Sequence, residues 1–157
     1  MTIRFATEND SGKILEFIHA LADYEKLSHE VVTTEEMLRI SLFGEKPEAE
    51  VLLIEDGSGV VGFALFFENY STFLGRKGIY LEDLFVLSRA RGKGFGMALL
   101  KRLAEIALER ECGRLEWNVL DWNHTAIRFY ESLGAKPMNG WTTFRLDGDA
   151  LRTFSIT

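Results

Sequence analysis

The sequence contains few of the cysteine and histidine residues that cross-link small folds through disulfides or bound metals. Its 157 residues include one cysteine, Cys112, and only three histidines. A single cysteine cannot form an internal disulfide, and this is typical of a chain kept in a reducing compartment. The histidines show no metal-ligand spacing with one another or with Cys112, so we expect no bound metal. They are His19, His29 and His124.

Long apolar runs and an excess of basic residues are also missing. The longest nearly apolar stretch, residues 59–67, is far too short to cross a bilayer, and the first ten residues lack the apolar core of a signal peptide. The formal net charge is −6 and the pI is near 5.1, whereas nucleic-acid binders usually present a basic face. We therefore expect a cytoplasmic protein with no membrane and no nucleic-acid partner.

What remains is an ordinary globular composition. Hydrophobic residues make up 46% of the chain and charged residues 27%, with no repeat, low-complexity segment or linker. A chain of this length can bury roughly 70% of its unfolded surface, so it needs no metal or disulfide to fold. Residues 1–157 are expected to form one domain.

Hydrophobic periodicity alternates between strand and helix patterns. Four helices are predicted: one with an apolar stripe from Ile14 to Leu21, one from Thr33 or Thr34 to Gly44, a long one after Gly96, and a short one between Asn123 and Gly134. Strands are predicted at residues 3–5, 51–54, 60–67, 78–87, 114–120 and 141–146. This mixture predicts an α/β fold with a mainly antiparallel sheet flanked by helices. Regular alternation in strand 78–87 places Glu82 with Leu84 on one face and Asp83 with Phe85 on the other.

The most informative segment is a glycine-rich turn between that strand and the long helix. Glycines at 92, 94 and 96 remove the Cβ obstacle, so that several backbone N–H groups can converge on one anion near the positive end of a helix. Arg91 and Lys93 add positive charge at the rim. The pattern predicts a phosphate or diphosphate site, although a tight turn that merely starts a helix explains the glycines equally well.

Two familiar phosphate loops are excluded here. The P-loop pattern is absent, and the dinucleotide fingerprint needs a glycine where Met97 stands. Arg91, Gly94 and Gly96 instead match the pattern Gln/Arg-x-x-Gly-x-Gly/Ala, and in this the sequence resembles the GNAT superfamily of acyl-CoA N-acyltransferases. The resemblance covers essentially the whole chain. It is greatest to the diamine group, the spermidine/spermine and thialysine N-acetyltransferases, in residues 21–27, 80–86, 122–130, 134–135 and 140–141.

The resemblance implies a GNAT fold, with a mixed, mostly antiparallel twisted sheet of six to seven strands and about four helices. It implies acetyl-CoA as co-substrate, a small cationic molecule with a primary amine as acceptor, and a homodimer. Three groups of residues would hold the cofactor. They are Leu84, Phe85 and Val86 for the pantetheine arm, Arg91, Gly92, Lys93, Gly94, Phe95, Gly96 and Met97 for the diphosphate, and Asn123, His124, Thr125 and Ala126 for its far side. Core packing is a second explanation for Phe85 and Val86, and both can hold.

Acetyl transfer to an amine requires two proton movements. The incoming amine has a pKa of about 10 and must lose a proton, while the leaving thiolate, with a pKa of about 8.5, benefits from receiving one. Tyr130 is the candidate acid, because a tyrosine serves this role at the matching position of the family. It lies seven residues after Asn123, about two helical turns on and near the same face. An aromatic residue packed on the sheet is the alternative.

Glu82 is the candidate base. A normal glutamate is about six pKa units too weak to deprotonate an alkylammonium directly, so we expect it to bind the ammonium and to act through an ordered water. Asp83, Tyr24 and Glu25 match substrate-side positions, although a structural carboxylate and a solvated helix end explain them nearly as well.

One departure from the diamine group bears on the acceptor. Ser71 stands near the place of an aspartate, in a loop that is about one residue longer. Loss of that carboxylate favours a shorter amine, such as thialysine, over a long polyamine. Two alternatives remain: a protein or peptide N-acetyltransferase, and a non-catalytic acyl-CoA-binding module. The presence of both Glu82 and Tyr130 argues against the module, which needs neither.

Overall fold

The computed structural model describes all 157 residues, which fall into two compact units, Met1–Asn118 and Val119–Thr157. We call them the N-terminal and the C-terminal unit and describe each by itself. None of the helices is both long and apolar enough to span a membrane.

The N-terminal unit is built on one five-stranded sheet with the strands in chain order. β1 to β4 pair antiparallel, and β5 adds to β4 in parallel. This confirms a mixed, mainly antiparallel α/β sheet. The strands are β1 (Thr2–Phe5), β2 (Glu50–Asp56), β3 (Gly59–Ser71), β4 (Arg76–Val86) and β5 (Leu115–Trp117).

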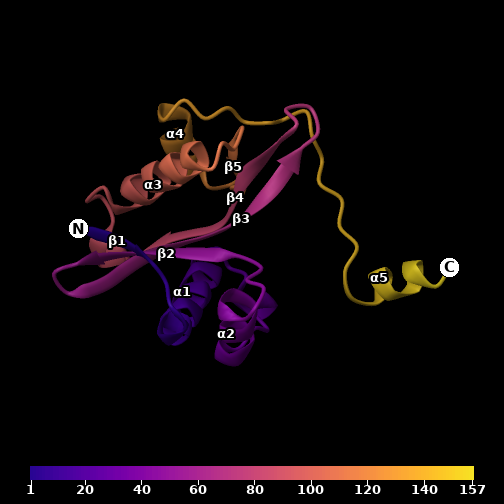
Figure 1. Ribbon diagram of the computed structural model, residues 1–157, viewed down its shortest axis with the longest axis horizontal. Helices are drawn as coiled ribbons and strands as arrows, with labels where there is room; N and C mark the ends of the chain where they lie inside the picture. Colours follow the sequence, from indigo (N-terminus) through magenta and orange to yellow (C-terminus); the bar gives the residue numbers. More distant parts are fainter. The chain divides into compact units, whose positions relative to one another are not determined.

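Three helices cover this sheet, two on one face and one on the other (Figure 1). α1 (Ser11–Tyr24) and α2 (Glu35–Phe43) share a face, and α3 (Phe95–Glu109) takes the opposite one. α2 begins as predicted, because the Thr34 hydroxyl accepts a hydrogen bond from the Met37 amide at 3.2 Å, and it ends at Gly44. Short 3-10 turns lie at Glu8–Asp10 (η1), Ser28–Glu30 (η2) and Ser88–Ala90 (η3).

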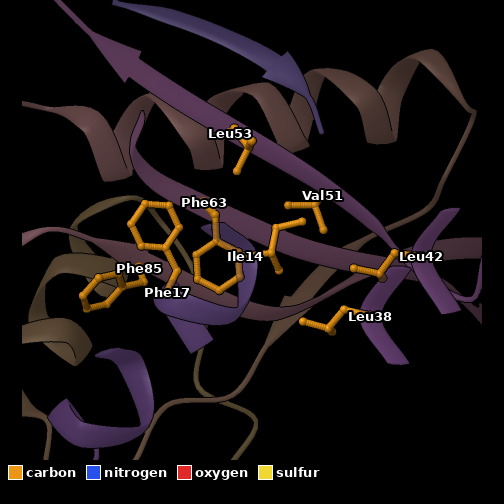
Figure 2. Close-up of a cluster of buried hydrophobic side chains, with 8 residues drawn as sticks. All are labelled: Ile14, Phe17, Leu38, Leu42, Val51, Leu53, Phe63 and Phe85. Carbon is orange, nitrogen blue, oxygen red and sulfur yellow. The ribbon is translucent and has the colours of Figure 1, made fainter. Parts of the chain in front are cut away.

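An aromatic cluster fastens α1 to the sheet. The Phe17 ring of α1 stacks on Phe63 of β3 at 5.5 Å between ring centres and lies 5.9 Å from Phe85 of β4, with Ile14 and Leu53 alongside (Figure 2). Burying side chains of this size stabilises the fold by about 1.5–3 kcal/mol each. The end of β4 is thereby held against the middle of α1.

A bulge interrupts β4 at Glu82. Leu81 pairs with Phe66 and Asp83 pairs with Leu65, so Glu82 is an extra residue with no partner of its own on β3. Leu65 and Phe66 are consecutive and face opposite sides of the sheet, so Leu81 and Asp83 also face opposite sides. The predicted alternation, which placed both on one face, is therefore wrong beyond the bulge.

The C-terminal unit contains α4 (His124–Ser132) and α5 (Gly148–Ser155) and no strand. As predicted, the Asn123 side chain caps α4, and Gly134 follows its end with a φ of +87°. The strand predicted at 141–146 is absent, because a strand forms only beside another strand and this unit has none. The sheet therefore has five strands, where six to seven were expected. The chain has five helices, where about four were expected, and α5 is the additional one.

Candidate active site

The turn after β4 is open on its glycine side. Gly92 and Gly94 have φ values of +75° and +85°, a region that residues with a Cβ enter only at a cost. A Cβ built on either glycine would meet no atom within 4 Å. These glycines are therefore required by the backbone path and leave free space above the turn.

The backbone amides of this turn have no acceptor within the chain. None of the N–H groups of residues 92–97 donates an internal hydrogen bond, and the first internal bond runs from Ala98 to the carbonyl of Gly94. Six donors thus accompany the positive end of α3, a helix of fifteen residues. Free amides at the positive end of a helix suit a bound diphosphate, such as that of acetyl-CoA. A turn that only starts a helix does not need to leave these amides free.

The edge of β4 beside the turn is also unpaired. β5 pairs with β4 only at residues 79–81, so β4 beyond the bulge has no strand on that side. The Leu87 amide bonds to the Val61 carbonyl at 2.9 Å, which fixes the antiparallel register and turns the backbone groups of Leu84 and Val86 away from β3. The Phe85 side chain is buried in the core, as its second explanation required.

The bulge gathers carboxylates on the α1 face of the sheet. Asp83 lies on the face of Phe85, and burial raises its pKa to about 6, with smaller contributions from the nearby charges of Glu82 and Glu25. Burial also raises the pKa of Glu25, which follows the last residue of α1. Glu82 is exposed to solvent. Asp83 therefore lies on the face opposite to Leu81, and the bulge leaves Glu82 exposed between them.

We expect Asp83→Asn to flatten the pH dependence of stability. Between pH 3.8 and about 6 the folded protein keeps a proton on Asp83 that the unfolded chain has released, so its stability falls as the pH rises through this window. At pH 7 the loss amounts to about 3 kcal/mol in wild type, and the amide variant avoids it. Urea unfolding at pH 4, 5, 6 and 7 measures the effect, with Asp23→Asn on the exposed side of α1 as control. Parallel profiles for wild type and Asp83→Asn would contradict the expectation.

Tyr24 lies beside the first residue of the glycine-rich turn. It is the last residue of α1, and its ring lies 4.9 Å from the guanidinium carbon of Arg91. The structure thus brings Tyr24 beside Arg91 and Glu25 near Asp83, and their substrate-side roles stay predictions.

The remaining predicted residues lie in the C-terminal unit. Tyr130 is on α4, half-buried, with its ring 5.5 Å from that of Phe129. The Asn123 carboxamide oxygen accepts a hydrogen bond from the Ala126 amide at 3.2 Å, so that amide already has a partner. The roles of Tyr130 and of residues 123–126 stay predictions.

Tyr80 was not singled out from the sequence, and it lies near the charges of Glu82 and Glu116. Its ring packs 5.3 Å from that of Phe67. Burial raises the pKa of the Tyr80 phenol, and the negative charges of Glu82 and Glu116 raise it further. Alternation from Glu82 would have indicated it.

Ser71, which stands in for the aspartate, is buried, and its hydroxyl accepts a hydrogen bond from the Leu74 amide at 3.3 Å. No three acidic, histidine or cysteine side chains come together in a way that could hold a metal.

Comparison with known proteins agrees with this geometry. Residues 14–135 match the model of the acetyltransferase (GNAT) family. The chain is 43% identical to thialysine N-epsilon-acetyltransferase of Mus musculus, over 96% of this chain and 94% of that protein. It is 36% identical to L-ornithine N5-acetyltransferase NATA1 of Arabidopsis thaliana, over 96% and 86% respectively.

Among solved structures, an integron cassette protein from the mobile metagenome of V. cholerae superposes with a TM-score of 0.83. It is 28% identical, and the match covers 99% of this chain and 98% of that one. The chain therefore belongs to the acetyltransferase (GNAT) family and is an N-acetyltransferase, which moves the acetyl group of acetyl-CoA to an amine.

Proposed function

We propose that this enzyme acetylates the terminal amine of a short lysine-like compound, with thialysine or ornithine as the model acceptor. The observation that carries the proposal is the bulge in β4, which turns Asp83 to the α1 face near Glu25 and leaves Glu82 exposed where the edge of the strand becomes unpaired. A cluster of carboxylates attracts a cationic acceptor. Relatives that act on thialysine and on ornithine, at 43% and 36% identity, support an acceptor of that length.

Acetyl-CoA supplies the acetyl group as co-substrate, and the chain supplies the surfaces that orient it. The outward backbone groups of Leu84 and the outward amide of Val86 would pair with the pantetheine arm, since the Val86 carbonyl already accepts a hydrogen bond from Arg91. The free amides of residues 92–97 would hold the diphosphate. Residues 123–126, at the start of α4, would line the far side.

Glu82 and Tyr130 would handle the two protons. Glu82 is exposed beside the bulge, where it can hold the ammonium and pass its proton to an ordered water. The half-buried Asp83 and Glu25 would add attraction for the cationic acceptor. Tyr130 would give its phenolic proton to the leaving thiolate, at an uphill cost of about 2 kcal/mol.

The two units would work together as one acetyltransferase domain, residues 1–157. The match to the family model supports this, because it runs from residue 14 to residue 135 and so crosses the boundary between the units. A homodimer, inferred from resemblance, and a cytoplasmic location, in keeping with the single cysteine, complete the proposal. Light scattering of the purified protein and fractionation of the source cells test these two points.

A panel of amines tests the acceptor. Release of free CoA is followed with thialysine, ornithine, lysine, putrescine and spermine, and with a lysine-containing basic peptide. We expect kcat/KM for thialysine or ornithine to exceed that for spermine and for the peptide by about tenfold or more, which corresponds to about 1.4 kcal/mol of discrimination. A peptide that outperforms every free amine would identify a protein acetyltransferase instead. Tight CoA binding without turnover of any acceptor would identify a binding module.

A further inference from the structure

The Arg91 side chain connects three parts of the candidate site. Its Nε donates a hydrogen bond to the Val86 carbonyl, on the unpaired edge of β4, at 2.9 Å. Its guanidinium carbon lies 4.9 Å from the centre of the Tyr24 ring and 5.5 Å from that of Phe85. Arg91 itself opens the glycine-rich turn of residues 91–97, which we call the cofactor turn because it is proposed to hold the diphosphate. One guanidinium therefore spans this turn, the strand edge and the end of α1.

This connection is rigid on one side. The Phe85 ring is buried against Phe17, which anchors the aromatic surface beneath the guanidinium. A cation over an aromatic face is held by the charge distribution of the ring, and the contact strengthens where water is excluded. Arg91 makes no ion pair with any carboxylate of the chain, so Tyr24, Phe85 and the Val86 carbonyl define its position.

Tyr24 in turn fixes the position of the chain that follows α1, which forms the proposed acceptor side of the site. It ends α1, and the chain then passes through Lys26, whose φ is +61°, with the Leu27 amide bonded back to the Ala22 carbonyl at 2.8 Å. Glu25 lies in this tight exit, near Asp83. A shift of the Tyr24 ring therefore moves the carboxylate that faces the acceptor.

We propose that Arg91 is a positioning residue for the amine as well as a part of the cofactor turn: through Tyr24 it holds the acceptor-side end of α1 against the turn that binds acetyl-CoA. The inference rests on the proposed function, which places the amine beside Glu25 and the diphosphate at the turn. It assigns to Arg91 an effect on amine binding that a residue of the turn alone does not have.

A double-mutant cycle tests the coupling. Arg91→Gln keeps the residue type that the Gln/Arg position of the turn pattern accepts but loses the stacked cation, and Tyr24→Leu loses the ring. We expect each single variant to raise the KM for the amine about three- to tenfold, with the KM for acetyl-CoA changed less than about threefold. The double variant should be no worse than the poorer single variant, because both remove the same contact.

Two matched variants separate this effect from general damage. Arg89→Gln removes an exposed arginine two residues earlier, which pairs with Asp56 at 3.5 Å rather than with an aromatic ring. Tyr70→Leu removes a ring that is 62% exposed on β3. Both should leave the two KM values unchanged, and the urea midpoints of all variants should agree.

Additive effects in the cycle would overturn the inference, and so would an Arg91→Gln variant that changes only the KM for acetyl-CoA. Either result leaves the proposed function standing, since wild type still turns over the amine. Failure of wild type to acetylate any amine would instead remove the proposed function, a result that the amine panel reads independently.

Discussion

Replacement of Tyr130 by phenylalanine should lower kcat about a thousandfold while leaving the KM for acetyl-CoA nearly unchanged. Loss of a positioned general acid typically costs between about 10² and 10⁴ in rate. The phenol is proposed to protonate the thiolate only as the C–S bond breaks, so its removal affects the transition state and not the binding of the co-substrate. Steady-state kinetics with the best amine of the panel measure both constants.

Tyr70→Phe is the matched control for Tyr130. It deletes the same hydroxyl from an exposed ring of the N-terminal unit and should retain full activity. If Tyr130→Phe keeps more than about a third of the wild-type kcat, the loss is too small for a general acid, and the alternative of a packed aromatic on α4 takes its place.

Substitution of Gly94 by alanine should raise the dissociation constant for CoA about a hundredfold. The left-handed backbone at this residue, with a φ of +85°, costs a residue with a Cβ about 1–2 kcal/mol, and the strain pulls the turn away from the geometry that aligns its amides. The new methyl group would also enter the open space where the diphosphate is expected. Isothermal titration calorimetry of the purified variant with CoA gives the constant directly.

Gly75→Ala separates the effect of backbone strain from the loss of the CoA-binding site. Gly75 lies in the turn between β3 and β4 with a φ of +62°, and an added Cβ there also meets nothing within 4 Å. Both alanine variants should lose similar unfolding stability, but only Gly94→Ala should lose CoA affinity. Equal affinity in the two variants would mean that the amides of residues 92–97 do not hold the diphosphate.

The glycine-rich turn and the helix boundaries could be predicted because their signals are local. Thr34, Gly44, Asn123 and Gly134 act through hydrogen bonds and dihedral angles within a few residues, and the structure confirms each as a helix end or cap. The glycines at 92 and 94 likewise indicated positive φ values through their residue type alone.

The errors concern features that depend on distant parts of the chain. A regular alternation along β4 carries no sign of the bulge, which exists only in relation to Leu65 and Phe66 on β3. The segment 141–146 alternates like a strand, but a strand also needs a neighbour, and pattern alone does not supply one. The Arg91–Tyr24 contact joins residues 67 positions apart and has no local signature.

Placing Glu82 outside the ladder also frees that position from the demands of folding. Its neighbours Leu81 and Asp83 keep the pairing of the sheet between them, so a different side chain at 82 would disturb neither the hydrogen bonds of β4 nor the packing beneath it. Under the proposed function, acceptor binding would depend on Glu82 while the pairing of the sheet depends on its two neighbours. An enzyme arranged in this way would exchange one amine for another through changes at this single unpaired position, with its hydrophobic interior unchanged.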